Sequence, residues 1–523
     1  MDVLFINPGN AKNIYQDLAE DYSAIETPTW SLLLAQSCRS VGYEVDILDV
    51  NAERLGEEEA VNRIKRLNPR LVCFVVYGQN PNSGTVNMSG TVKLAKAIKN
   101  SGFTSPVSIV GSHVQALPYE TLEREKDVDF IFTNEAVYAL WNVLKLDNMA
   151  DVEQLKSVRG LGIRLNGKVH LTFPERIVPA SRMDIDLPGY AWDLLPYKEK
   201  PLDLYRAHFW HAEYDHDKRT PFAAIYTSLG CPFKCGFCMI NILNRNDNDP
   251  IGDAANYSKM RFWSPEFIIQ EFDKLVGMGV KTLRISDEMF LLNKKYYVPL
   301  CKLLKERGYG DILAMWAYSR VDTIKNPENL KLLKEAGIKW LGIGIESADP
   351  NIRLEVTKGK FENLDIREVI KKVQDADLGV IANYLFGLAG DNMESMQKTL
   401  DLSLELNTIA WNGYAVMALP GSKVYKEAIK AGHELPSDYI GYSFHSYETK
   451  PLPTEYLTPA QILKFRDEAW MKYHTHPPFL DKIEKMHGKR IRQNIEDMAK
   501  IKLKRKILGD RLDRYPLIEV PIR

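Results

Sequence analysis

Two long stretches of this chain alternate short apolar runs with amphipathic segments of helical period. The first stretch covers residues 1 to 150, and the second covers residues 223 to 421. Strands that alternate with helices form parallel sheets, and such sheets bind ligands at the carboxyl ends of their strands. A chain of 523 residues also exceeds the usual size of one core. The sequence therefore predicts an α/β protein with two sheet units, each with a ligand-binding edge.

The first unit is expected to be a Rossmann-like parallel sheet, because five apolar runs are separated by helix patterns and turn residues. The expected strands are 3–7, 43–50, 71–78, 106–114 and 128–135, and the expected helices are 29–43, 57–67 and 89–102. Four strand ends carry polar or glycine-bearing turns, namely Asn7-Pro8-Gly9, Tyr77-Gly78-Gln79, Gly111-Ser112-His113 and Thr133-Asn134-Glu135.

The second unit is expected to be a partial (β/α)6 barrel, because six strands fall short of the eight that close the usual α/β barrel. These strands are 223–230, 282–290, 311–320, 339–347, 379–387 and 413–421. A hairpin at 162–171, with Asn166-Gly167 at its turn, and a proline-bearing stretch separate the two units. The predicted parts are a Rossmann-like domain at 1–150, a hairpin and linker at 151–218, the barrel at 219–445 and a helical region at 446–523.

Three of the six cysteines, Cys231, Cys235 and Cys238, lie in one turn-rich loop after the first barrel strand. A structural zinc site normally takes four protein ligands, and no fourth cysteine is near. Thiolates hold iron–sulfur clusters, and three of them can hold three irons of a four-iron cluster while the fourth iron stays open. The spacing therefore favours an iron–sulfur cluster over zinc.

This C-x3-C-x2-C loop resembles that of the radical S-adenosylmethionine (radical SAM) superfamily, and Phe237 stands where that family has an aromatic residue. The resemblance implies a [4Fe–4S] cluster that binds S-adenosylmethionine (SAM) and cleaves it with one electron to a 5′-deoxyadenosyl radical. It also implies SAM contacts at later strand ends. These are Asp287 or Glu288 for the methionine ammonium, Glu346 for the ribose hydroxyls and Asn383 as a polar contact.

The α/β unit in front of the barrel resembles the cobalamin-dependent branch of that superfamily, with segments 34–50 and 109–122 as its characteristic parts. The resemblance implies cobalamin at the strand ends, and His113 is not expected to bind cobalt, because residues 111–116 read GSHVQA instead of D-x-H-x-x-G. The expected cobalamin contacts are Tyr77, Gly78, Gln79, Gly111, Ser112 and His113.

The net charge and the lengths of the apolar runs limit the classes of partner that the protein is expected to bind. The formal net charge is -1, which does not favour nucleic acid or an acidic membrane. No apolar run approaches the ~20 residues that span a bilayer, and the first residues do not form a signal peptide, so a reducing cytoplasm is expected. Cys38, Cys73 and Cys301 lie in apolar patterns and are predicted to be core residues.

The C-terminal region is basic and helical. Residues 482–506 carry ten Lys or Arg against three Asp or Glu. A solvated helix face is favoured over a cover for an anionic substrate. The extended segment at 445–459 is expected to close over the mouth of the barrel.

Taken together, the resemblance implies a cobalamin-dependent radical SAM C-methyltransferase that acts on an unactivated carbon of a small biosynthetic intermediate. It would receive electrons from an external donor such as flavodoxin or ferredoxin. One alternative is a cyclase or oxidoreductase of the same branch that transfers no methyl group, and another is a binding module that senses cobalamin or redox state. A sugar, a lipid and an antibiotic intermediate all remain open as substrates.

Overall fold

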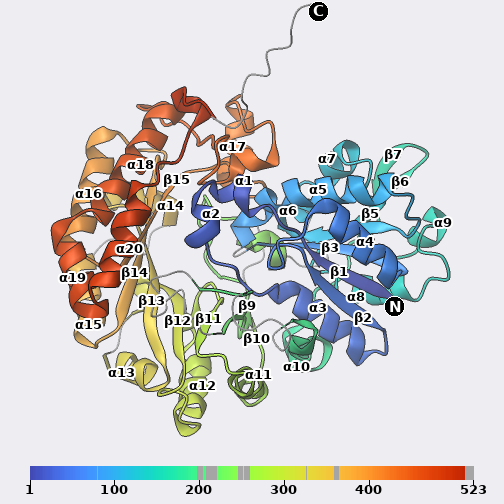
Figure 1. Ribbon diagram of the computed structural model, residues 1–523, viewed down its shortest axis with the longest axis horizontal. Helices are drawn as coiled ribbons and strands as arrows, with labels where there is room; N and C mark the ends of the chain where they lie inside the picture. The colour runs from blue at the N-terminus through green and yellow to red at the C-terminus, as the bar shows by residue number, and fades with distance from the viewer. Residues whose placement is uncertain are drawn as a thin grey trace, which may run out of the picture.

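The protein folds into two α/β halves that lie side by side (Figure 1). The structure is a computed structural model that describes residues 1–78, 81–196, 204–207, 221–244, 251, 259–324, 327–357 and 364–512. In Figure 1 the first half holds the blue and cyan strands, and the second holds the yellow and orange strands of a curved sheet. The α/β class expected from the sequence is confirmed.

The first half is built on a seven-stranded sheet in the order β2-β1-β3-β4-β5-β6-β7. The first five strands run parallel, and their order of 2-1-3-4-5 is that of flavodoxin-like doubly wound folds. The strands are β1 (Val3–Asn7), β2 (Val45–Asp49), β3 (Leu71–Val76), β4 (Val107–Gly111), β5 (Phe130–Phe132), β6 (Leu161–Leu165) and β7 (Lys168–Leu171).

The hairpin that was expected to belong to the linker is part of this first sheet. Its first strand, β6, pairs antiparallel with β5 and places Ile163 opposite Phe130. Both of these side chains are buried, so the hairpin extends the core of the first half instead of leaving it. The sheet therefore continues to Leu171, about twenty residues past the expected end of the domain.

Helices cover both faces of the first sheet, as the doubly wound order requires. The apolar side chains of α3 and α8 pack on one face, and those of α4 and α5 pack on the other. Helix α4 begins with three glutamates and ends at Asn68 in the left-handed conformation, which matches the helix dipole and a common helix stop. The helices are α3 (Thr29–Ser40), α4 (Glu57–Leu67), α5 (Gly84–Asn100), α6 (Ser112–Ala116), α7 (Pro118–Arg124) and α8 (Val137–Leu144).

The second half is a six-stranded parallel sheet whose strands follow one another in chain order, with β8 and β15 at its edges. The expected last strand at 413–421 is placed too late, because the ladder between β14 and β15 begins at Ala410 and ends at Ala415. Residues 416–421 leave the ladder, and Val416, Met417 and Leu419 line a cavity instead. The strands are β8 (Phe222–Ile225), β11 (Thr282–Ile285), β12 (Ala314–Arg320), β13 (Ile338–Glu346), β14 (Gly379–Phe386) and β15 (Ala410–Ala415).

The helices between the barrel strands begin at the side-chain caps that the sequence provides. Ser264 accepts a hydrogen bond from the amide of Phe267 at the start of α11, and Asn392 with Ser395 forms a capping box at the start of α16. A short hairpin of β9 (Ser228–Leu229) and β10 (Arg261–Phe262) flanks the cysteine loop. The helices are α11 (Pro265–Gly277), α12 (Lys294–Glu306), α13 (Pro327–Glu335), α14 (Pro350–Thr357), α15 (Ile366–Asp375), α16 (Met393–Leu406) and α17 (Lys423–Lys430).

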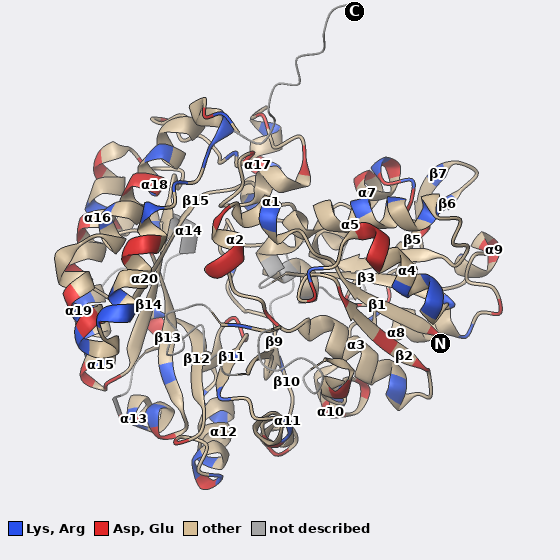
Figure 2. Ribbon diagram, viewed as in Figure 1, with Lys and Arg blue, Asp and Glu red and all other residues tan. Residues whose placement is uncertain are grey.

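Three further helices follow, α18 (Pro459–His474), α19 (Pro477–His487) and α20 (Lys489–Lys500). Helix α18 packs against the edge strand β15, and α19 and α20 pack against α18. Figure 2 shows blue and red segments interleaved along them, and Arg492 of α20 pairs with Asp481, Glu484 and Glu496. This pattern is that of a solvated, mixed-charge surface.

One basic residue of the C-terminal segment departs from this solvated pattern. The side chain of Arg505 is fully buried and donates to Asp467 and to the backbone oxygens of Phe444 and Ser446. From the other side, Gln16 donates to the backbone oxygens of His445 and Lys504. Segment 443–449 is therefore held between the beginning and the end of the described chain.

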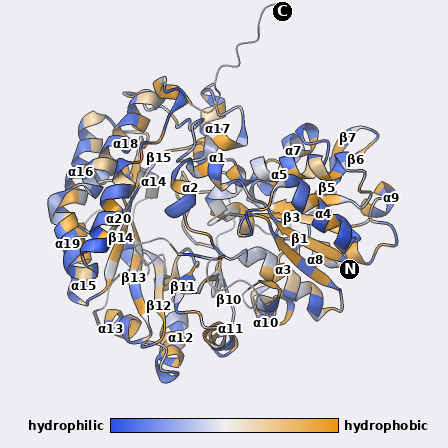
Figure 3. Ribbon diagram, viewed as in Figure 1, coloured by the Kyte–Doolittle hydropathy of each residue, from blue (hydrophilic) through white to orange (hydrophobic). Residues whose placement is uncertain are grey.

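Apolar residues concentrate in the strands of both sheets, as the orange segments in Figure 3 show. The prediction that Cys38, Cys73 and Cys301 are core residues is confirmed, since each is at most 1% exposed. Within the described ranges, no helix is both long and apolar enough to cross a bilayer.

Candidate active site

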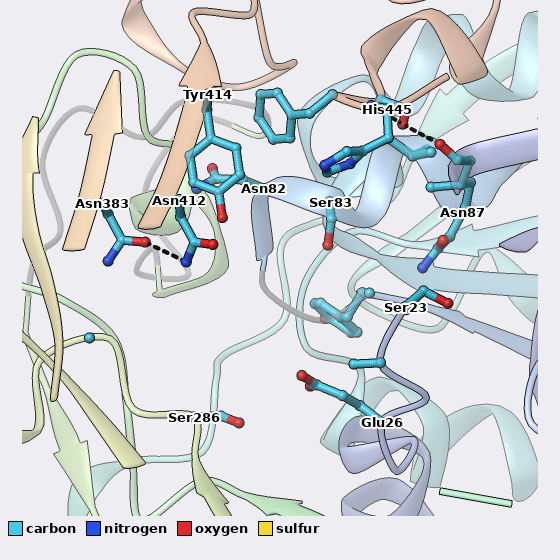
Figure 4. Close-up of a pocket in the computed structure, with 18 of the residues that line it drawn as sticks. Ser23, Glu26, Asn82, Ser83, Asn87, Ser286, Asn383, Asn412, Tyr414 and His445 are labelled. Carbon is cyan, nitrogen blue, oxygen red and sulfur yellow. Dashed lines mark hydrogen bonds between the residues drawn. The ribbon is translucent and has the colours of Figure 1, made fainter. Parts of the chain in front are cut away.

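A cavity of about 590 Å³ lies where the strand ends of the two halves face each other. Its walls come from the barrel strands β11 to β15, the cysteine loop, the ends of β1 and β3, and the short helices α1 (Ala11–Tyr15) and α2 (Leu18–Asp21). Figure 4 shows Asn383 of the barrel and Glu26 of the first half reaching into it from opposite walls. Both halves are therefore needed to form the site.

The three predicted cluster ligands, Cys231, Cys235 and Cys238, all line this cavity. They are held on a short loop in which the amide of Cys238 donates to the carbonyl of Cys235 at 3.1 Å. On the barrel side, the carbonyl of Gly236 accepts from the amide of Val424 at the start of α17. Phe237, the aromatic residue before the last cysteine, also faces the cavity and packs beside Val416.

Burial raises the pKa of all three thiols, and that of Cys235 reaches about 12. Two neighbours oppose this effect. The guanidinium of Arg320, at the end of β12, lowers the pKa of Cys235, and the amide of Asn82, from the first half, lowers that of Cys238. The ligand form of cysteine is the thiolate, so positive charge and N–H donors beside the sulfurs suit a metal-bound loop.

The arrangement of the loop suits a multi-iron cluster. Among the residues that the structure describes, no group of three or more His, Cys, Asp or Glu side chains is arranged to hold a single metal ion. The three thiols instead border one open cavity, with room in front of them for a cluster and a ligand on its open iron.

The two neighbouring acids after β11 have different surroundings. Asp287 is fully buried and accepts three hydrogen bonds of 2.6 Å, from the amide and hydroxyl of Thr227 and the hydroxyl of Ser228. Glu288 lines the cavity, and its Oε2 atom is buried without a hydrogen-bond partner. Burial raises the pKa of Glu288 to about 8 and that of Asp287 to about 6. Only Glu288 has an oxygen free for a ligand's ammonium group.

Glu346 ends strand β13 in an unusual backbone conformation. Its φ is +64°, a region that side chains with a Cβ rarely occupy, and the register between β13 and β14 shifts just before it. A Cβ on Gly344 would lie 2.5 Å from Oε1 of Glu346, so only glycine leaves room for this carboxylate. Burial raises the pKa of Glu346 to about 7, and Arg320 opposes this rise. Strained residues of this kind concentrate at functional sites.

Asn383 lies one strand further along, on β14, and accepts a hydrogen bond of 3.1 Å from the amide of Asn412 on β15. Figure 4 shows this pair on the barrel wall. The side chain of Asn383 also donates to the backbone oxygens of Ile343 and Ile381. Its amide is thus held in one orientation at the edge of the cavity.

The first half contributes Tyr77 and Gly78, which follow β3 and line the cavity. Tyr77 stacks on Trp30, with ring centroids 4.9 Å apart, and its hydroxyl accepts from Gln115. Gly78 is exposed at a φ of +75°, and a Cβ there would lie 2.4 Å from Oγ of Ser83. The predicted contact Gln79 lies outside the described residues.

The other three predicted cobalamin contacts, Gly111, Ser112 and His113, do not line the cavity. His113 is 5% exposed, contacts Thr85 through Nδ1 and packs edge-on against Tyr439. Burial lowers its pKa to about 3, so the imidazole is neutral. The end of β4 is covered by the protein itself.

The turn after β5 joins the two halves. Glu135 forms a buried ion pair with Arg261 of the barrel half, at 2.6 Å, and accepts from the amide of Val178. The polar strand end that the sequence marked as a ligand contact is therefore a contact between the halves.

Sequence reasoning missed a second ion pair, which lies on the cavity wall. Glu26, from the loop before α3, accepts from Arg284 of β11, and both side chains are less than a tenth exposed. The guanidinium of Arg284 also lies over the ring of Tyr318. No motif marks Glu26, but a charged residue inside the apolar strand 282–285 was a visible signal for Arg284.

Two family models match this chain. The Radical SAM superfamily matches residues 225–403, and the B12 binding domain matches residues 16–144. The chain belongs to the cobalamin-dependent radical SAM family. Its cavity lies between the two matched regions, and the matched radical SAM region contains the cysteine loop and the acids at the ends of β11 and β13.

Relatives of this radical SAM protein match over most of its length. An uncharacterized methyltransferase of Pyrococcus horikoshii is 26% identical over 88% of this chain and 90% of its own. The anaerobic magnesium-protoporphyrin IX monomethyl ester cyclase of Cereibacter sphaeroides is 22% identical over 86% of this chain and 67% of its own.

A solved structure shares the whole fold. The radical SAM methyltransferase TsrM of Kitasatospora setae, with cobalamin and a [4Fe–4S] cluster bound, superposes with a TM-score of 0.65. It covers 96% of this chain and 99% of its own at 15% identity. The two-half architecture described above is therefore the architecture of a known enzyme.

Proposed function

We propose that this protein is a cobalamin-dependent radical SAM C-methyltransferase that acts on an unactivated carbon of a small biosynthetic intermediate. The observation that carries the proposal is the single cavity bordered by the cysteine loop, by Glu288 and Glu346 of the barrel, and by Tyr77 and Gly78 of the first half. A methyl carrier and a radical source must both reach one substrate carbon, and a shared cavity meets that requirement. The full-length likeness to a methyltransferase supports methyl transfer as the outcome.

When bound, the [4Fe–4S] cluster supplies the electron that cleaves SAM to a carbon radical, and cobalamin carries the methyl group to be transferred. Cys231, Cys235 and Cys238 hold the cluster in this proposal. Three protein ligands would leave one position of such a cluster open to SAM.

The barrel residues hold SAM in one orientation. Glu288 accepts from the methionine ammonium, because one of its oxygens is buried without a partner, whereas both oxygens of Asp287 are occupied by Thr227 and Ser228. Glu346 accepts from the ribose hydroxyls, and Asn383 adds a polar contact one strand further along. The raised pKa of Glu346, about 7, means that its carboxylate is only partly ionised near neutral pH.

The first half holds the corrin in this proposal. Gly78 allows close approach to the ring because it has no side chain and a left-handed backbone. Tyr77 lines the cavity, and its ring is held by stacking on Trp30 and by a hydrogen bond from Gln115. His113 is not a cobalt ligand, since its imidazole is buried against Thr85 and Tyr439 away from the cavity.

The chemistry also requires a supply of electrons. An external one-electron donor, such as flavodoxin or ferredoxin, would reduce the cluster. A reducing cytoplasm is the compartment that keeps three free cysteines ready for cluster assembly. The substrate is a small molecule, because the cavity lies between the halves and is bordered by a buried ion pair and aromatic rings.

A cyclase of the same branch is the second candidate, because the chain also matches the anaerobic magnesium-protoporphyrin cyclase over most of its length. The two functions differ in their products. A methyltransferase yields a metabolite heavier by one methylene unit, whereas a cyclase yields one of unchanged carbon count.

The test uses anaerobically purified full-length protein, reconstituted with iron, sulfide and hydroxocobalamin and then reduced in the presence of SAM. Formation of 5′-deoxyadenosine is expected. If the loaded, reduced protein forms none, it is a sensor or binding module instead of an enzyme. Mass spectrometry of extracts from cells with and without the active protein then distinguishes methylation from cyclisation.

A further inference from the structure

The side chain of Asn82, from the first half, reaches the cysteine loop. This residue lies in a short 3₁₀ turn, η1 (Pro81–Ser83), between the end of β3 and the start of α5. Its Nδ2 atom donates to Sγ of Cys238 at 3.7 Å, and its Oδ1 atom accepts from the amide of Met239 at 3.1 Å. A side-chain oxygen only accepts, so the backbone amide at Oδ1 fixes the orientation of the side chain and directs its N–H donors toward the sulfur.

The backbone next to the turn that carries Asn82 packs closely against its neighbours. A Cβ on Gly84, just after the turn, would lie 1.9 Å from Oγ of Ser112 and 2.9 Å from the carbonyl oxygen of Val76. Before the turn, a Cβ on Gly78 would lie 2.4 Å from Oγ of Ser83. The backbone around Asn82 is therefore packed against the ends of β3 and β4, and its side chain is pre-organised.

The loop that receives this hydrogen bond is fixed as well. After Cys238 the chain forms the turn η5 (Ile240–Asn244), in which Ile242 is fully buried and its amide donates to the carbonyl of Met239. Helix α6 of the first half packs against η5. The contact between Asn82 and Cys238 thus joins two turns that come from the two halves.

We infer that Asn82 sets the reduction potential of the cluster by donating a hydrogen bond to the Cys238 thiolate. This inference rests on the proposed function, since it requires a cluster on the three cysteines. Hydrogen bonds to the sulfur ligands are among the factors that set the potentials of iron–sulfur clusters. The reduced cluster carries one more negative charge, so a donor at the thiolate stabilises it and raises the potential.

The step itself is a simple one-electron reduction. The external donor loses one electron, the cluster gains it, and no covalent bond forms or breaks. The N–H proton stays on Asn82 throughout. Asn82 touches neither SAM nor substrate in this scheme, and it is a positioning residue that acts through Cys238.

The experiment measures the midpoint potential of the reconstituted, cobalamin-free cluster by a redox titration followed by electron paramagnetic resonance. Asn82→Leu removes the donor at nearly constant size, and Asn82→Asp replaces it with acceptor oxygens. Asn87→Leu is the matched control, because Asn87 lines the same cavity from α5 and is not the donor to Cys238. Asn82→Leu is expected to lower the potential by up to about 59 mV, a tenfold change for one electron. Asn82→Asp should lower it at least as far, and Asn87→Leu should leave it unchanged.

Wild-type potentials in both Asn82 variants would overturn the inference. If the variants fail to hold a cluster, the wild-type protein still decides the question. Labelling its asparagines with ¹⁵N should produce a hyperfine coupling to the reduced cluster, together with an exchangeable proton, and the absence of both would contradict the hydrogen bond. If the wild-type protein assembles no cluster at all, the proposed function fails, and this outcome is distinct from an unchanged potential.

Discussion

The strand ends of the two sheets face one cavity, but they contribute to it very differently. In the barrel, all five strands from β11 to β15 place side chains or backbone on the cavity wall. In the first sheet only the ends of β2, β1 and β3 do so, through Asn51, Asn7 and the turn at Tyr77 and Gly78. The ends of β4 and β5 are covered by other parts of the chain.

This difference shows that a polar strand end has two possible uses. At β4, His113 packs against Tyr439, and α6 packs against the turn that follows the cysteine loop. At β5, Glu135 forms its ion pair with Arg261 of the other half. These two ends hold the halves together, so that the remaining ends can face a common space. A rule that assigns ligands to the carboxyl edge of a sheet marks both uses alike.

The largest effect is expected from replacing the cysteines of the barrel half. Replacing Cys231, Cys235 and Cys238 together with Ala should abolish the visible absorption of the cluster and all formation of 5′-deoxyadenosine, because no ligand remains for iron. Circular dichroism should show an intact fold, and hydroxocobalamin should still bind to the first half. A triple variant that still cleaves SAM would contradict the role of the loop.

The next effect concerns a single strand end of the barrel. Glu346→Gln should weaken SAM binding by about 1–3 kcal/mol, the range for loss of a charge-assisted hydrogen bond. The ionised carboxylate of Glu346 accepts hydrogen bonds better than the protonated form. The affinity of the wild-type protein for SAM should therefore fall as the pH is lowered through the Glu346 pKa of about 7. Calorimetry on both proteins checks this, with cluster content as the control. An unchanged affinity and a shared pH profile would return Glu346 to a structural role.

A smaller effect is expected at the end of β3 in the first sheet. Gly78→Val adds a branched side chain at a φ of +75°, where even a Cβ would lie 2.4 Å from Oγ of Ser83. Cobalamin affinity should fall by about tenfold, or about 1.4 kcal/mol. Titration with hydroxocobalamin measures this change, and Gly102→Val provides a control at a similar φ far from the cavity. Equal affinities in both variants would remove this turn from the corrin site.

The smallest effect is expected at the end of β4. His113→Ala should leave the spectrum of bound cobalamin unshifted, because His113 lies outside the cavity and is neutral. A lower affinity for cobalamin is compatible with this prediction, since the variant leaves a gap beside Tyr439. A change in the cobalt coordination spectrum would show that His113 reaches the metal, and the distinction between the ends of β3 and β4 would then be lost.

Most of the fold could be predicted from the sequence, because its strands are continuous apolar runs closed by glycine, proline or asparagine. Two of the departures have clear causes. The hairpin at Asn166-Gly167 was recognised, but only the pairing of Ile163 with Phe130 shows which sheet it joins. The last strand was placed too late, since the apolar run after Ala415 lines a cavity instead of continuing the ladder.

Some residues of the candidate site could likewise be predicted from the sequence, and others could not. Cys231 and Glu346 could be found from the sequence because a local motif or a strand end marks them. The choice between Asp287 and Glu288 could not, since it depends on which carboxylate the hydroxyls of Thr227 and Ser228 occupy. The pairing of Glu26 with Arg284 could not be predicted either, because the charge within an apolar strand marks Arg284 but does not indicate its partner in the other half.

The burial of Arg505 has a consequence for the order of events during synthesis. Ribosomal synthesis delivers the first half early, and domains generally fold as they emerge. One wall of the cavity, at Phe444 and His445, is held by Arg505 and by the contact of Gln16 with Lys504. The hydrogen bonds that hold that wall cannot form until residue 505 has left the ribosome. The cavity therefore stays accessible to a bulky cofactor while the chain is being made, and it closes when Arg505 binds segment 443–449.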